Sequence, residues 1–163
     1  CNKLIKRSLI LADKFIYPTA SFCEDYVYSI QLAIYARKIG YVPKPLYNYC
    51  HREGSVVTSR SIEAIQNRIS DNLANHQLVE YIIDNNGLKS LYYSELIFLK
   101  LLVKNSIRLH IQHNGFYGLW CRTYPELIWE IFKSPYVSHR SRIAYLLTLI
   151  GMYPIVKKII KNA

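Results

Sequence analysis

The chain has 163 residues, enough for one domain with a hydrophobic core, and its 51% hydrophobic and 20% charged residues exclude a disordered protein. The net charge of +10 favours anionic partners such as lipid headgroups, diphosphates or nucleic acid. The four cysteines form no C-x-x-C pair, so we expect isolated thiols and predict no metal site within the chain.

The first forty residues predict two helices. A short amphipathic helix is expected within residues 2–13. Residues 21–24 (Ser-Phe-Cys-Glu) have the spacing of a capping box, which predicts that a second helix begins there. This helix is expected to run to about Lys38, with Gly40 marking its end.

A change of pattern follows the second helix. Residues 41–49 combine two prolines with aromatic and β-branched residues, which favours short extended segments at strand ends or a sheet edge. A polar loop is expected at residues 51–55. We therefore predict a small extended or β segment near residues 40–57.

Everything after about Thr58 is predicted to be helical. Apolar residues recur with a helical period until residues 85–87 (Asn-Asn-Gly), which predict the end of a long helix. A second helix is expected at about residues 89–113. It is apolar nearly all round between Leu96 and Val103, so we expect it to be the buried centre of a helical layer.

Two further helices are predicted towards the C-terminus. Residues 123–126 (Thr-Tyr-Pro-Glu) again have capping-box spacing, and a short helix is expected to follow and end near Pro135. The last helical region is expected to start near Ser138 and to break at Gly151 and Pro154.

Residues 143–156 form a largely apolar stretch flanked by basic residues. A spanning helix needs about 20 apolar residues, so this stretch is too short to cross a bilayer. Two alternatives remain open: an amphipathic helix on an anionic membrane surface, or an ordinary core helix with solvated charged ends. No acidic residue follows Glu130.

Two groups of residues are candidates for chemistry. The adjacent carboxylates of Glu24 and Asp25, at a predicted helix start, could orient a hydroxyl or act as a general base. The alternative is structural, because acids in a first turn are stabilised by the capping box and the helix dipole. In the polar loop, His51 and Arg52 could contact phosphate oxygens and Gly54 would allow close backbone approach, whereas a simple polar turn is the alternative.

The order of these motifs resembles family 2 of the inverting, GT-A type glycosyltransferases. The matching segments are C-N-K-L-I-K-R at 1–7, E-D-Y-V-Y at 24–28, V-P-K-P-L-Y-N-Y at 42–49 and R-E-G-S at 52–55. In bacterial members that make surface polysaccharides, the corresponding stretches read approximately W-N-K-L-x-K-R, Y-E-D-x-x-F and P-x-P-L-Y-x-Y-R-x-R-E-G-S. The resemblance covers roughly residues 1–60.

The resemblance implies a role for each candidate. Asp25 would be the general base that deprotonates the acceptor hydroxyl, and Glu24 would orient or contact the acceptor. The loop would close over the diphosphate of a nucleotide-sugar donor, through His51, Arg52, Gly54 and Ser55. The chain departs from the family at Cys1 and Cys23, where aromatic residues are usual, and at Cys50, where an arginine is usual.

The family's nucleotide-binding half is not recognisable in the sequence. That half is Rossmann-like and carries an Asp-x-Asp motif that holds Mg²⁺ or Mn²⁺, and this chain contains neither feature. We therefore expect the metal ligands to lie mainly outside the chain, and the chain alone to be inactive. The resemblance implies a saccharide or lipid-linked acceptor and a cytoplasmic location, with peripheral attachment to the inner face of the cell membrane as an open alternative.

The predicted fold class is α+β and predominantly helical, without the Rossmann-like half. Residues 1–57 are expected to be the C-terminal part of a catalytic domain, and residues 58–163 a helical appendage with a basic, amphipathic C-terminal segment. The alternative is a non-catalytic helical domain that binds a partner or a membrane surface. Nucleic acid is not an expected partner, because the basic residues are spread over several helices and match no recognition motif.

Overall fold

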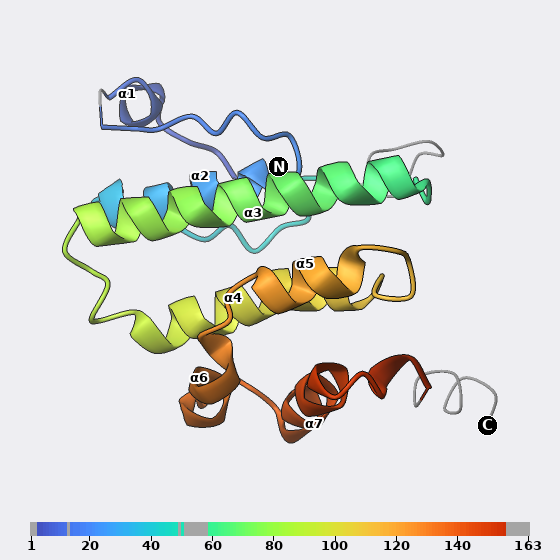
Figure 1. Ribbon diagram of the computed structural model, residues 1–163. Helices are drawn as coiled ribbons and strands as arrows, with labels where there is room; N and C mark the ends of the chain where they lie inside the picture. The colour runs from blue at the N-terminus through green and yellow to red at the C-terminus, as the bar shows by residue number, and fades with distance from the viewer. Residues whose placement is uncertain (1–2, 13, 49, 51–58, 156–163) are drawn as a thin grey trace. The chain divides into compact units, whose positions relative to one another are not determined.

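The computed structural model describes residues 3–12, 14–48, 50 and 59–155 (Figure 1). Over these residues the chain consists of helices and irregular connections, so the predicted helical character is confirmed. The chain divides into two compact units, Cys1–Ile82 and Ile83–Ala163. The predicted boundary at 57/58 concerns a catalytic domain and its appendage, and it stays a prediction. In the described part of the chain, no helix is long and apolar enough to cross a bilayer.

The first unit contains α1 (Arg7–Ile10), α2 (Glu24–Tyr35) and most of α3 (Ile62–Asn85). Figure 1 shows α2 beside the much longer α3. The predicted apolar stripe of α3 is confirmed in its central part, where Ile65, Ile69 and Val79 are buried. The start of α3 is capped by the Ser61 hydroxyl, which accepts a hydrogen bond of 3.1 Å from the Ala64 N–H.

The predicted end of α3 is confirmed and has a local cause. Gly87 has a φ of 68°, a left-handed conformation that glycine adopts without a steric penalty. The Gly87 N–H donates to the Asp84 carbonyl at 2.9 Å, and the Leu88 N–H donates to the Ile83 carbonyl at 3.0 Å. These two bonds form a Schellman motif, which satisfies carbonyls at the end of the helix.

Helix α2 is present, but it ends at Tyr35, before the predicted end at about Lys38, because the backbone is already extended at Ala36. Its predicted capping box is also wrong. The helix begins at Glu24, its N-cap is Cys23, and no side chain caps it. The backbone N–H groups of Ser21 and Phe22 instead donate to a carboxylate oxygen of Asp71 on α3. A distant side chain therefore takes over the function that local spacing assigned to residues 21–24.

Gln31 of α2 holds the chain segment before the helix. The Ile16 N–H donates to Gln31 Oε1 at 2.7 Å, and Gln31 Nε2 donates to the Ile16 carbonyl at 2.8 Å. The Gln31 side chain is fully buried, so its amide acts like a neighbouring strand for one residue of irregular backbone. The rings of Phe15, Tyr17 and Tyr28 pack against one another beside this pair.

The predicted β component is not present in the described residues. Residues 41–48 form neither strand nor helix, and all eight are exposed. Pro43 and Pro45 have no N–H to donate, and a single exposed segment has no neighbouring strand to pair with. The remainder of the predicted segment, residues 49 and 51–57, lies outside the described residues.

The second unit is built on α4 (Tyr93–Arg108), which packs against α5 (Phe116–Arg122) and α6 (Leu127–Lys133). The last helix, α7 (His139–Leu149), completes it. The predicted burial at the centre of α4 is confirmed for Leu96, Ile97, Leu101 and Val103, whereas Leu102 is exposed.

Two features of the second unit differ from the predictions. Helix α5 was not predicted, and Thr123 follows its last residue. The Thr123 hydroxyl donates to the Leu119 carbonyl of α5 at 2.9 Å, so it does not cap the next helix as its spacing predicted. Helix α6 has Glu126 at its N-cap position, without a side-chain cap. Its predicted end before Pro135 is confirmed.

We expect Gln31→Met to destabilise the first unit by about 2 kcal/mol or more, because the Ile16 N–H and carbonyl lose their side-chain partner. Urea unfolding followed by circular dichroism measures the change. Gln77→Met is the matched control, since Gln77 is exposed on α3 and its replacement should change the unfolding free energy by less than about 0.5 kcal/mol. Equal effects of the two substitutions would contradict the assigned role of Gln31.

Candidate functional site

Glu24 and Asp25 are the first two residues of α2, and both side chains are exposed. An N-terminal helical turn carries a partial positive charge, which favours carboxylates there. The helix continues for 12 residues, and its side bearing Val27 and Gln31 is buried. The two acids therefore lie on a fixed element and face solvent, where a hydroxyl could reach them.

The loop before the acidic pair is bonded to side chains of α3 through both its N–H groups and its carbonyl groups. Asp71 Oδ2 accepts hydrogen bonds from the N–H groups of Ser21 (3.2 Å) and Phe22 (3.0 Å). Asn75 Nδ2, one helical turn further along α3, donates to the Phe22 carbonyl at 2.7 Å and to the Ala20 carbonyl at 3.4 Å. Both donors and acceptors of the loop are thus satisfied, and the start of α2 is fixed in place.

Cys23, directly before the acidic pair, has a φ of 64°. This left-handed conformation costs a non-glycine residue about 1–2 kcal/mol, and such strain is frequent at functional sites. Burial, followed by the charges of Asp25, Glu24 and Asp71, raises the pKa of the Cys23 thiol. The raised pKa favours the protonated thiol at neutral pH, and the protonated form is the less nucleophilic one.

A further contact between α2 and α3, which continues within α3, was not predicted from the sequence. The Tyr26 hydroxyl lies 3.4 Å from Nδ1 of His76, and His76 Nε2 lies 3.9 Å from a carboxylate oxygen of Glu80. His76 is fully buried. The sequence contains no sign that Tyr26, fifty residues away, would be the neighbour of His76.

The predicted donor-side loop cannot be placed relative to this pair. His51, Arg52, Gly54 and Ser55 all lie outside the described residues. Within residues 3–12, 14–48, 50 and 59–155, no three His, Cys, Asp or Glu side chains come together as a set that could hold a metal ion. Of the predicted site, the described residues include the acidic pair, Glu24 and Asp25, and the α3 side chains that hold the loop before it.

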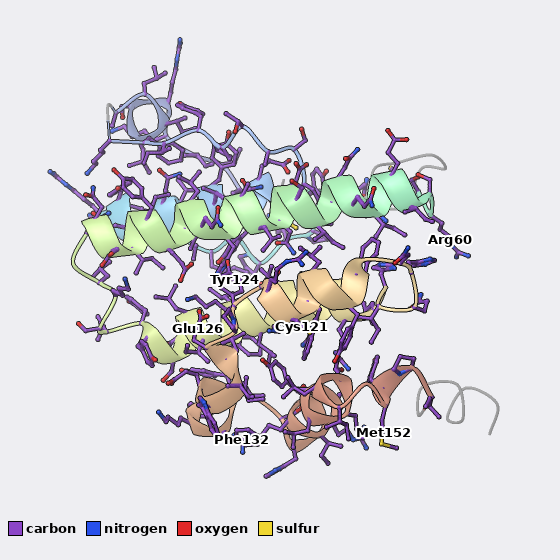
Figure 2. All side chains as sticks on the ribbon, viewed as in Figure 1. Arg60, Cys121, Tyr124, Glu126, Phe132 and Met152 are labelled. Atoms are coloured by element: carbon purple, nitrogen blue, oxygen red, sulfur yellow. The ribbon has the colours of Figure 1, made fainter. Side chains whose placement is uncertain are left out.

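The most unusual buried group is Lys104, in the second unit. Its side chain is 1% exposed, and its ammonium donates to the carbonyls of Thr123 (2.7 Å) and Tyr124 (3.3 Å), directly after α5. Figure 2 shows Tyr124 in the connection between α5 and α6. The ammonium also lies 4.4 Å from the ring centre of Trp120 and 5.3 Å from that of Tyr145.

Through these contacts Lys104 connects α4 to α5 and to α7. Carbonyls at the end of α5 carry partial negative charge, and aromatic ring faces attract cations, so both surroundings favour an ammonium. Burial opposes it and lowers the pKa of Lys104 to about 8. The sequence predicted an apolar centre for α4, and the periodicity contained no signal for a lysine inside it.

We expect Asn75→Leu to loosen the loop before α2, because the carbonyls of Ala20 and Phe22 lose their donor. Amide hydrogen exchange at Ser21 and Phe22 should become faster by about tenfold, which corresponds to roughly 1.4 kcal/mol. Asn67→Leu, at an exposed position of α3, is the matched control and should leave both amides unchanged. Unchanged exchange in the Asn75 variant would argue against the clamp.

We expect the stability of the wild type, relative to Lys104→Met, to rise with pH from about 8 towards 10. The folded protein loses the Lys104 proton near pH 8, whereas an unfolded lysine keeps it to about 10.5, so the unfolded state binds more protons in this window. The pKa of Tyr145, raised by burial to about 12, lowers the stability of both proteins as pH rises above 10, so the comparison is made between pH 8 and 10.

Urea unfolding at several pH values measures this difference between the wild type and Lys104→Met. The matched control is Lys133→Met, at an exposed position of α6. This variant still contains Lys104, so its stability should depend on pH as that of the wild type does. A difference between wild type and Lys104→Met that stays flat from pH 8 to 10 would show that the carbonyls and rings outweigh burial.

No protein-family model matches the chain, and comparison with curated proteins and with solved structures found no match.

Proposed function

We propose that this chain is part of an inverting glycosyltransferase of the GT-A type and that Asp25 is its general base. The observation that carries the proposal is the exposed acidic pair at the first turn of α2, directly after the strained Cys23. The failure of the predicted capping box supports it, because Glu24 has no capping role that would explain its presence. The helix dipole alone remains as a structural explanation.

The proposed reaction is a single displacement at the anomeric carbon. The acceptor hydroxyl attacks this carbon while Asp25 takes the hydroxyl proton, and the bond between the anomeric carbon and the diphosphate oxygen breaks. The electron pair of that bond leaves with the nucleoside diphosphate. A base held on a fixed helix start reduces the entropy lost in aligning the acceptor, and the clamps by Asp71 and Asn75 supply that rigidity.

Glu24 would contact the acceptor beside the base. The donor diphosphate would be bound by the loop at residues 51–55, through His51, Arg52, Gly54 and Ser55, as the family resemblance implies. The resemblance also implies Mg²⁺ or Mn²⁺, but the described residues provide no ligand set for it. The metal ligands would therefore belong mainly to a nucleotide-binding half outside this chain.

The exposed apolar residues after α2 support the idea of a missing half. Residues 39–47 expose Ile39, Tyr41, Val42, Leu46 and Tyr47, each by at least half of its surface. Such a run of exposed apolar side chains is unusual for a segment that faces only water. In the proposed enzyme it would pack against the nucleotide-binding half, which also contains the sheet.

We expect Asp25→Asn, in a protein that joins this chain to its nucleotide-binding half, to reduce kcat for sugar transfer by about 10²–10⁴-fold, because a carboxamide accepts no proton. Transfer of a labelled sugar from nucleotide-sugar to acceptor measures the rate. Asp84→Asn is the matched control, since Asp84 is an exposed acid paired with Lys89, and it should keep full activity. Full activity of Asp25→Asn would favour the alternative, a non-catalytic helical domain.

Calorimetry on the chain alone separates the two parts of the proposal. We expect no micromolar binding of a UDP-sugar, with or without Mg²⁺. Metal-dependent micromolar binding would contradict the missing half without bearing on Asp25.

A further inference from the structure

Helix α7 and the residues directly after it present a continuous set of exposed apolar side chains. Ile143, Leu146 and Ile150 are spaced by three and four residues, which places them on one side of the helix. Met152 and Ile155 follow. All five are between 43% and 66% exposed, and we call them the α7 apolar face.

The helix that carries this face is firmly attached on its other side. Tyr145 and Thr148 are buried, and the Tyr145 ring lies 5.0 Å from that of Trp120 on α5. The Tyr117 hydroxyl of α5 donates to the Leu149 carbonyl at 3.0 Å. The α7 apolar face is therefore a property of a packed helix, and its exposure does not result from a frayed end.

Both ends of α7 are specified locally. The Ser138 hydroxyl accepts a hydrogen bond of 3.2 Å from the Ser141 N–H at the start. At the other end, Gly151 has a φ of 71°, and the Met152 N–H donates to the Leu147 carbonyl at 2.8 Å. The predicted start near Ser138 and the predicted break at Gly151 are confirmed. The predicted break at Pro154 is wrong, because residues 153–155 are helical and proline is tolerated in the first turn of a helix.

The C-terminal part of the sequence that contains α7 is basic. The sequence has no acidic residue after Glu130, whereas six basic residues follow it: Lys133, Arg140, Arg142, Lys157, Lys158 and Lys161. Arg140 is exposed and lies one turn before Ile143, on the same side of the helix. An apolar helix face within a sequence stretch that has basic and no acidic residues is the composition expected at an anionic lipid surface.

We propose that the α7 apolar face binds the surface of an anionic bilayer, with α7 parallel to the membrane plane. A bilayer surface supplies hydrocarbon for the apolar side chains and negative charge for the exposed Arg140. A second copy of this chain fits less well, because it would bring together two chains that each have a net charge of +10. The proposal concerns a different site from the proposed glycosyl transfer and does not depend on it.

Two aromatic residues of α6, Trp129 and Phe132, are also exposed. Aromatic rings are favoured at the boundary between lipid and water. In the view of Figure 2, Phe132 and Met152 lie on the same side of the second unit, away from α4 and α5. The helix itself has 11 residues, too few to cross a bilayer but enough to lie on one.

The test is flotation of the full chain with vesicles of phosphatidylcholine alone or with added phosphatidylglycerol. We expect binding that requires phosphatidylglycerol and weakens as salt is raised. The triple variant Ile143→Gln, Leu146→Gln, Ile150→Gln should lower the partition coefficient by at least about tenfold, because three apolar contacts with lipid are lost. Ile150 follows the last residue of α7, so the single variant Ile150→Gln leaves the helix intact. It should lower the partition coefficient by about threefold.

The control is a second triple variant with similar exposure, Leu91→Gln, Leu102→Gln, Leu109→Gln, around α4. It should bind vesicles like the wild type. Equal binding to both vesicle types, or unchanged binding of the α7 variants, would overturn the proposal. So would gel filtration showing that the α7 variants turn an oligomer into a monomer while the wild type binds no vesicles, since the face would then join copies of the chain.

Discussion

Irregular backbone between packed helices must have its N–H and carbonyl groups paired, and in this chain a few polar side chains provide the partners. Gln31 pairs both groups of Ile16, and Asn75 donates to the carbonyls of the loop before α2. Lys104 does the same for the connection after α5. Each of these side chains is buried on a helix, so a rigid element determines the path of an irregular one.

Asp71 accepts hydrogen bonds from two N–H groups of the loop directly before the acidic pair. Since Asp71 and Asn75 are one turn apart on α3, they bind opposite sides of the same short backbone segment. The strained conformation of Cys23 is tolerated because its neighbours are held in this way. The position of Glu24 and Asp25 is thus a consequence of α3, although α2 carries them.

In the second unit, the side chain that pairs the irregular backbone is charged: it is the ammonium group of Lys104. An ammonium in a core is destabilised by the loss of hydration, and it is offset here by two carbonyls and two aromatic rings. This compensation links α4 to the end of α5 and to α7. As a result α7 is packed firmly through Tyr145 and Thr148 while its other side stays apolar and exposed.

The sequence by itself determined the presence of the long helices and the ends of α3 and α7, because the apolar period and the glycines at positions 87 and 151 act over only a few residues. It also identified Asp25 as a candidate, through the order of its motifs. Only the tertiary structure decided how α2 begins, since Asp71 competes with local capping from fifty residues away. The burial of Lys104 was likewise decided by carbonyls and rings on other helices, because a lysine is stable in a core only where distant groups replace its water.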